Sequence, residues 1–144
     1  MRHHTFLIAA VLLLLMTGGC KRLPDRPEGM PPLIPCTIEV TFGGERLPDV
    51  GVRLKPTNSS DWSAGGKTDT VGKAIMVTAT HYSGVVPGEY VVSFEKYAPE
   101  EIRSDGMPLP AKPLVPLKYS HQQSREIITV TKNQTVYHFE LEGM

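Results

Sequence analysis

The sequence is poor in cysteine, in net charge and in helical periodicity. Cys20 and Cys36 are the only cysteines in 144 residues, so a disulfide-stapled scaffold is excluded. Fifteen basic residues balance fifteen acidic ones, so the chain lacks the basic surface by which nucleic acids are bound. Beyond residue 19, no stretch of ten or more residues repeats its apolar positions with a helical period. An all-β domain without a nucleic-acid partner is expected.

Motifs for catalysis and for metal binding are also lacking. There is no Gly-x-Ser-x-Gly sequence, and Gly65-Gly66-Lys67-Thr68 lacks the upstream glycine of a phosphate-binding loop. The histidines of the domain stand singly, without the spacing of a zinc site, and the acidic residues of a proline-rich stretch lack a rigid scaffold. We therefore expect no catalytic residue, no metal and no cofactor, and predict that the protein is not an enzyme. The histidines considered are His81, His121 and His138, and the acidic residues of the proline-rich stretch are Glu100, Glu101 and Asp105.

Residues 1–19 have the pattern of a signal peptide. A basic start precedes an apolar run from Phe6 to Met16, which is too short for a bilayer that needs about 20 apolar residues. The run ends at Thr17-Gly18-Gly19-Cys20, which resembles the lipobox of bacterial lipoproteins, with Thr17 where that family usually has leucine. The resemblance implies that Cys20 becomes the lipid-modified N-terminus. The alternative is an ordinary secretory signal cleaved near Gly18.

The residues after Cys20 bear on location and reach. Lys21 stands where an aspartate would resemble an inner-membrane retention signal, so an outer-membrane location in the cell envelope is favoured. Residues 20–35 are rich in proline and are predicted to form an extended tether, reaching up to about 45 Å if they are fully polyproline-like. The lipid would make the membrane a partner of the protein.

Residues 36–142 read as a single domain of short strands. Ile38, Val40 and Phe42 alternate with polar residues, which is the pattern of a half-buried strand. Turn residues recur at intervals of roughly ten residues, which favours an antiparallel, immunoglobulin-like sandwich of about seven strands, with a partly open barrel as the alternative. The last two strands are predicted to form a hairpin. Strands are expected at 37–42, 50–55, 67–69, 74–77, 90–94, 125–131 and 135–142.

Two turns frame the centre of the chain. Asp69-Thr70-Val71-Gly72 begins with a side-chain acceptor and ends with glycine, while Pro87-Gly88 joins a fixed φ to a residue that tolerates positive φ. Residues 98–119 contain five prolines and show no strand or helix period. We expect them to lie along the surface as polyproline-like chain or to be partly mobile.

These turns also carry a family resemblance. Thr68-Asp69-x-x-Gly72-x-Ala74 followed by Pro87-Gly88-x-Tyr90 resembles the carboxypeptidase-regulatory-like and transthyretin-like (prealbumin-like) sandwich domains. Residues 47–52 look like their second-strand entry, and residues 61–66 with 115–119 look like a group of small bacterial lipoproteins built on this domain. The resemblance implies an accessory module. Some transthyretin-like proteins hydrolyse a purine-breakdown product, but the Tyr-Arg-Gly-Ser of their site is missing here.

Two side chains remain as candidates for a role. Trp62 either caps the open end of the core, the preferred interpretation, or stacks on a sugar or a partner side chain. Cys36 is expected to be a small buried hydrophobe, with a reactive thiol as the alternative. The leading hypothesis is a non-enzymatic, lipid-anchored envelope protein that acts as an interaction or structural module. The alternative is a carbohydrate- or small-ligand-binding module that uses the Trp62 loop, so an envelope protein or a glycan is the expected partner.

Overall fold

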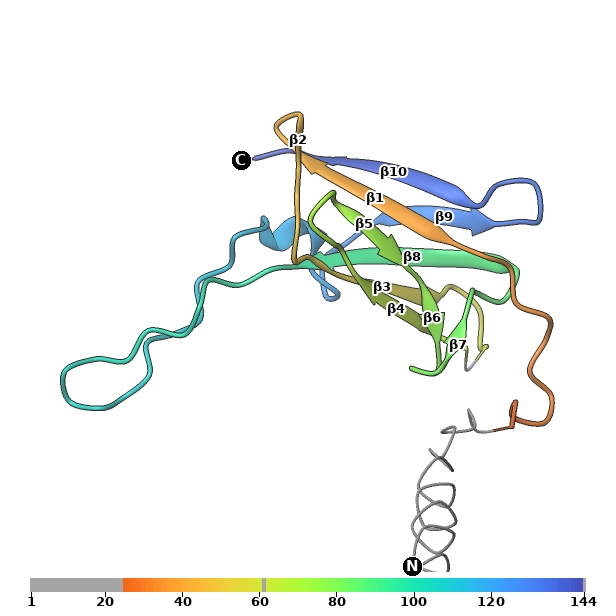
Figure 1. The fold of residues 1–144 in the computed structure, drawn as a ribbon, viewed down its shortest axis with the longest axis horizontal. Helices are drawn as coiled ribbons and strands as arrows, with labels where there is room; N and C mark the ends of the chain where they lie inside the picture. The colour runs from red at the N-terminus through yellow and green to blue at the C-terminus, as the bar shows by residue number, and fades with distance from the viewer. Residues whose placement is uncertain (1–24, 61, 144) are drawn as a thin grey trace, which may run out of the picture.

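The computed structural model describes residues 25–60 and 62–143, which form a sandwich of two sheets (Figure 1). The predicted signal peptide and Cys20 lie outside the described residues. Ten strands and one 3-10 helix occur within the described ranges. They are β1 (Thr37–Phe42), β2 (Glu45–Arg46), β3 (Gly51–Pro56), β4 (Ala64–Lys67), β5 (Lys73–Ile75), β6 (Val77–Thr78), β7 (Tyr82–Ser83), β8 (Gly88–Glu95), η2 (Leu117–Tyr119), β9 (Glu126–Val130) and β10 (Val136–Leu141).

The first sheet is built around β1, and the second around β3 and β8. In the first, the order is β10-β1-β2, and β5 pairs with the N-terminal half of β1. In the second, the order is β7-β6-β4-β3-β8-β9. All ladders are antiparallel except that of β1 with β10, which is parallel. The first and last of the described strands are thus neighbours in one sheet.

Alternating burial in β1 and β3 explains why the two sheets pack face to face. Val52 and Leu54 of β3 are buried while Arg53 and Lys55 face outward, and Ile38 and Val40 of β1 are buried in the same way. Side chains on one strand point alternately to opposite faces, so each sheet presents one apolar face to the other. Burying each such aliphatic side chain stabilises the fold by about 1.5–3 kcal/mol.

Aromatic side chains fill the wider part of the core. The Phe94 ring lies 4.9 Å from that of Phe139 in the opposite sheet and 6.3 Å from that of Tyr119 in η2, measured between centroids. Tyr90 is buried, and its hydroxyl donates a hydrogen bond of 2.8 Å to the carbonyl of Val86. The hydrogen bond satisfies the one polar atom that this ring brings into the interior.

The turn at residues 69–72 has the geometry that its residue types suggest. The Asp69 carboxylate accepts the amide hydrogens of Val71 and Lys73, both at 2.9 Å. Gly72 has a φ of 74°, and a Cβ there would lie 2.7 Å from the Val40 carbonyl oxygen. Neither the backbone conformation nor the space admits a side chain at this position. Gly88, after Pro87, is the first residue of β8 and has a φ of 156°.

Thr68 joins this turn to the start of β3. Its hydroxyl accepts the Val50 amide hydrogen and donates to the Leu47 carbonyl, both at 2.8 Å, and its side chain is buried. Buried main-chain groups that no strand can pair are costly unless a side chain satisfies them. Thr68 therefore fixes the entry to β3.

The prediction of an all-β sandwich is confirmed, and seven of the ten strands have three or more residues. The strands of the described residues form two separate sheets, so the alternative of a barrel is not realised. The strand expected at 67–69 lies earlier, at Ala64–Lys67. The predicted terminal hairpin is wrong. β9 pairs with β8 and β10 with β1, because the chain crosses between sheets at a turn where only Thr131 and Gln134 form a bridge.

Candidate functional site

The segment before β1 lies against the domain. Ile34 exchanges two main-chain hydrogen bonds of 2.8 Å with Val85, and its side chain is buried in the core. Met30 is also buried, and the Tyr82 hydroxyl donates a hydrogen bond of 2.8 Å to the carbonyl of Asp25. Residues 25–35 are therefore held along the domain, and the reach of about 45 Å given by a free tether does not apply to them.

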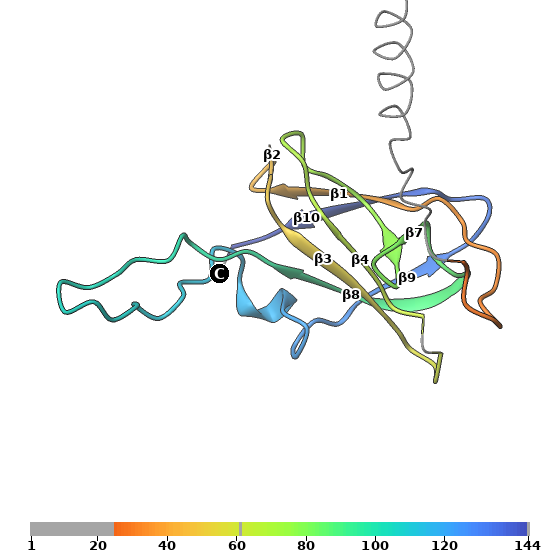
Figure 2. The ribbon, with the colours of Figure 1, turned by 60° about the horizontal axis from the view of Figure 1, so that its bottom comes forward.

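Residues 97–113, called the arm here, project from the sandwich as two antiparallel limbs (Figures 1 and 2). Bridges at Tyr97–Pro113 and Ile102–Pro108 hold the limbs together, and the Arg103 amide bonds the Met107 carbonyl at 2.8 Å across the tip. The prolines lack amide hydrogens, which explains why these limbs do not form a regular ladder. The stretch is thus self-paired and projecting, instead of being laid along the surface.

The arm and the segment after it collect exposed apolar side chains. Of the ten large hydrophobic residues that are exposed within the described ranges, six lie between residues 97 and 117. Ile102 and Met107 near the tip are 71% and 60% exposed. Soluble proteins rarely gather large apolar side chains on a surface without a partner for them. The six are Tyr97, Ile102, Met107, Leu109, Leu114 and Leu117.

Acidic residues lie beside this apolar surface. Asp105 forms an ion pair of 2.8 Å with Arg103 and caps the Met107 amide at the tip. Glu100 and Glu101 are exposed and line a hollow of about 580 Å³ along the arm, together with Leu109 and Lys112. The arm therefore carries solvated acidic groups as well as exposed apolar side chains, the two kinds of residue that interfaces combine.

Trp62 follows the loop after β3. Its side chain is half-buried, its amide donates to the Ser60 hydroxyl at 3.4 Å, and it is not among the described residues that form the core cluster. The next residue, Ser63, is exposed on the outer face of the second sheet. The described residues thus do not show Trp62 capping the core.

The remaining candidates are spread over the domain. Cys36 is buried and free, and burial raises the pKa of its thiol to about 11, which suits a buried apolar role. His81, His121 and His138 are all exposed. Within residues 25–60 and 62–143, no group of His, Cys, Asp or Glu residues could hold a metal ion, and no helix is long and apolar enough to cross a membrane.

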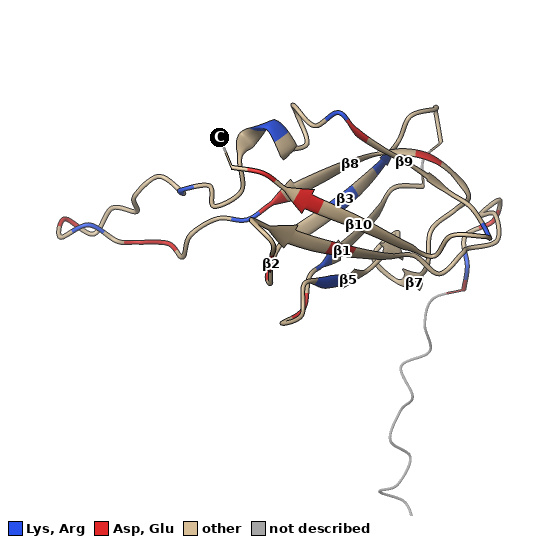
Figure 3. Cartoon of the chain, turned by 90° about the horizontal axis from the view of Figure 1, so that it is seen from above, with Lys and Arg blue, Asp and Glu red and all other residues tan. Residues whose placement is uncertain are grey.

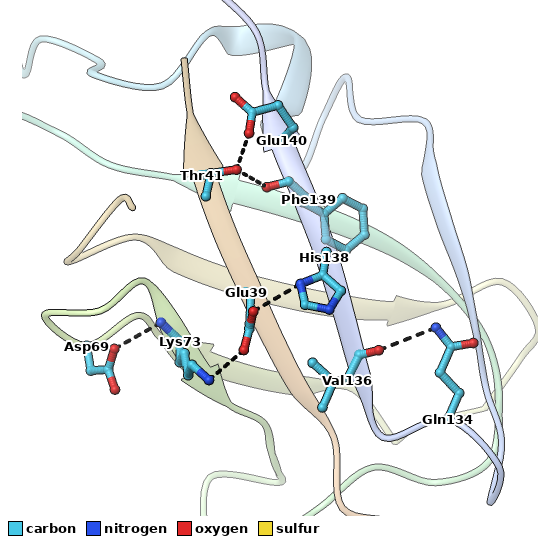
Figure 4. Close-up of polar contacts among 9 residues, drawn as sticks. All are labelled: Glu39, Thr41, Asp69, Lys73, Gln134, Val136, His138, Phe139 and Glu140. Atoms are coloured by element: carbon cyan, nitrogen blue, oxygen red, sulfur yellow. Dashed lines mark hydrogen bonds and ion pairs between the residues drawn. The ribbon is translucent and has the colours of Figure 1, made fainter. Parts of the chain in front are cut away.

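Two of the histidines lie within hydrogen-bond distance of a glutamate. His121 Nδ1 lies 2.6 Å from Glu95, and this hydrogen bond lowers the pKa of the Glu95 carboxyl. On the outer face of the first sheet, Glu39 bonds Lys73 of β5 at 2.7 Å and His138 of β10 at 3.0 Å (Figure 4). The bond from Lys73 lowers the pKa of Glu39. These pairs link neighbouring strands across a sheet.

The arm is therefore the candidate functional site. The sequence indicated an irregular proline-rich stretch but not the pairing that makes it project, because prolines obscure the alternation by which strands are recognised. Its one available signal was the set of large apolar residues, Ile102, Met107 and Leu109, in a stretch otherwise made mostly of charged residues, glycine and proline.

No family model matches the chain, and no characterised protein matches it in sequence. Among solved structures, a 9R-lipoxygenase from Cyanothece PCC8801 is similar over 97% of this chain, at 16% identity and a TM-score of 0.37. The match covers 23% of the lipoxygenase chain, so this protein spans about a quarter of its length. A likeness of this degree carries no argument about activity.

Proposed function

We propose that the protein is a non-enzymatic, lipid-anchored component of the cell envelope, favouring the outer membrane, in which a transthyretin-like sandwich presents the arm to another envelope protein. The observation that carries the proposal is the projecting, self-paired arm with its exposed apolar residues, among them Ile102 and Met107. Exposed apolar side chains rimmed by polar ones are typical of protein interaction sites. The anchor is Cys20, through the lipobox-like sequence that it ends.

Because Asp25 contacts the domain, only a short length of chain separates Cys20 from it. Residues 20 to 25 span at most about 18 Å when fully extended. Because Tyr82 bonds Asp25, a lipid on Cys20 would hold the β7 end of the domain within about that distance of the membrane. The arm leaves the opposite end of the domain (Figures 1 and 2), so it would point away from the residues that lead to the lipid.

Cell fractionation tests the anchor. Changing Cys20 to alanine removes the acceptor thiol, so we expect the protein to move from the membrane fraction to the soluble fraction. The matched control is Cys36→Ala, which removes the other thiol from a buried position and leaves the anchor intact. Retention of the Cys20→Ala protein in the membrane would contradict the proposed anchoring.

A further inference from the structure

The outer face of the second sheet carries two basic side chains beside a shallow depression. Arg53 and Lys55 are exposed at alternate positions of β3 and thus lie on one face, about 7 Å apart along the strand. Figure 3 shows the Lys and Arg positions of β3, which contains no Asp or Glu. Within residues 25–60 and 62–143, neither side chain forms an ion pair.

The strands beside Arg53 supply small residues. Arg53 lies opposite Gly65 of β4 on one side and Ser93 of β8 on the other. Two hollows, of about 580 and 290 Å³, meet at Arg53 and Ser63. Ala79 and Thr80 line the larger, and Lys55 and His121 line the smaller. The two together form a depression across the strands, called the outer hollow below.

The charges that face the outer hollow are predominantly positive. Among the described residues, Arg53 and Lys55 form no ion pair there, whereas Glu95 is bonded by His121 at 2.6 Å. Arg53 also lies close enough to Glu95 for its charge to contribute to the lowered pKa of that carboxyl. A ligand with negative charges spaced along an extended chain would therefore find Lys55, and Arg53 beside a Glu95 that already bonds His121, outside any ion pair of the described residues.

We propose that the outer hollow binds an anionic polysaccharide, whose acidic groups pair with Arg53 and Lys55 and whose sugar hydroxyls bond the serine and threonine side chains. Besides Val77 and Val91, the floor consists of small residues and has no Phe, Tyr or Trp ring, so it offers little of the aromatic surface on which a protein partner depends. Trp62 directly precedes Ser63 in the chain and is half-buried, so its fluorescence can respond to a ligand bound beside Ser63. The inference rests on neither the lipid anchor nor the arm.

Trp62 also provides the assay, because it is the only tryptophan of the protein. We would titrate the protein with oligogalacturonate, a uronic-acid oligomer, and with cellohexaose as a neutral oligomer, and follow tryptophan fluorescence at low and high salt. The proposal predicts saturable binding of oligogalacturonate that weakens as salt rises, and weaker binding of cellohexaose.

Two double variants distinguish an effect of these two side chains from an effect of the protein's net charge. Arg53→Gln/Lys55→Gln is expected to lower the affinity for oligogalacturonate at least about tenfold, because both charge-assisted contacts to the ligand are lost. Lys112→Gln/Lys132→Gln removes the same charge from the arm and from the turn after β9, and should leave the affinity unchanged. All four side chains are exposed, and circular dichroism checks that the variants fold.

Three results would overturn the proposal. The first is no saturable binding of oligogalacturonate, and the second is an equal loss of affinity in both double variants. The third is equally tight binding of poly-glutamate at the same charge, which would assign the outer hollow to acidic proteins instead of polysaccharides.

Discussion

Substituting Gly84 tests whether residues 25–35 are held on the domain. Gly84 has a φ of 105°, and a Cβ there would lie 2.8 Å from the Ile34 carbonyl oxygen. Gly84 is itself fixed, because its amide bonds the Met76 carbonyl and its own carbonyl accepts the Thr78 hydroxyl at 2.7 Å. In Gly84→Ala the N-terminal segment must therefore move away.

The size of the effect follows from what the segment loses. A left-handed backbone conformation costs a non-glycine residue about 1–2 kcal/mol. Two main-chain hydrogen bonds between Ile34 and Val85 add about 0.5–1.5 kcal/mol each, and exposure of the Ile34 side chain about 1.5–3 kcal/mol. We expect Gly84→Ala to lower the free energy of unfolding by about 4–8 kcal/mol if the segment detaches.

Gly106→Ala is the matched control. Gly106 lies at the tip of the arm with a φ of 79°, and a Cβ there would meet no atom within 4 Å. Gly106→Ala should lower the free energy of unfolding by only about 1–2 kcal/mol, which is what a left-handed backbone conformation costs alanine. Hydrogen exchange of the Ile34 and Val85 amides is the direct readout, and it should accelerate in Gly84→Ala alone. Unchanged protection of Ile34 in Gly84→Ala would refute the reasoning.

Three further predictions concern side chains of the sandwich. Thr68→Val keeps the shape of the side chain but leaves the buried Val50 amide and the part-buried Leu47 carbonyl without its hydroxyl. Urea unfolding should therefore show a loss of about 2–4 kcal/mol in the free energy of unfolding, against little change for the exposed Thr129→Val. Glu39 has a lowered pKa in the folded state, so the stability it contributes is present above its ordinary pKa of 4.5 and is lost as pH falls through the lowered value. The melting temperature of Glu39→Gln should accordingly fall less steeply as the pH is lowered than that of the unchanged protein. Equal slopes of melting temperature against pH would show that the Glu39 pairs add no stability. Burial raises the pKa of Cys36 to about 11, so at pH 8 a thiol reagent should modify it about 100-fold or more slowly in the folded protein than in urea; equal rates would contradict its burial.

The parts of the fold that the sequence predicted are those in which side-chain pattern and structure are both local. The alternation around Ile38 and Val52 located β1 and β3, and the residue types at Asp69 and Gly72 match the turn between β4 and β5. Period-two burial and turn chemistry act over a few residues, so they can be read directly from the chain. Partner strands cannot be read in this way.

The terminal hairpin illustrates that limit. A strand, a short turn and a strand usually pair with each other, and residues 125–142 have that pattern. In the structure, β10 lies in parallel register with β1, from Thr37 opposite Val136 to Phe42 opposite Leu141. This pairing joins residues about one hundred positions apart, and no local pattern specifies such a contact.

The segment before β1 and the outer hollow were predicted still less completely. Pro31, Pro32 and Pro35 suggested an extended tether, whereas Met30 and Ile34 in the same segment are buried against the domain. The outer hollow depends on Arg53, Ser63 and Ser93, which come from three separate segments. Their proximity is a property of the sheet, and the sequence shows only isolated polar residues.

Site-specific crosslinking in cells tests most directly whether the arm is an interaction surface. A photoreactive residue would replace Met107 at the tip of the arm and, as a matched control, Ile75 of β5, since these side chains are 60% and 66% exposed. The account predicts that position 107 captures one reproducible envelope protein and that position 75 does not. Capture of no foreign protein at position 107, or of the same proteins at both positions, would contradict the proposed role of the arm.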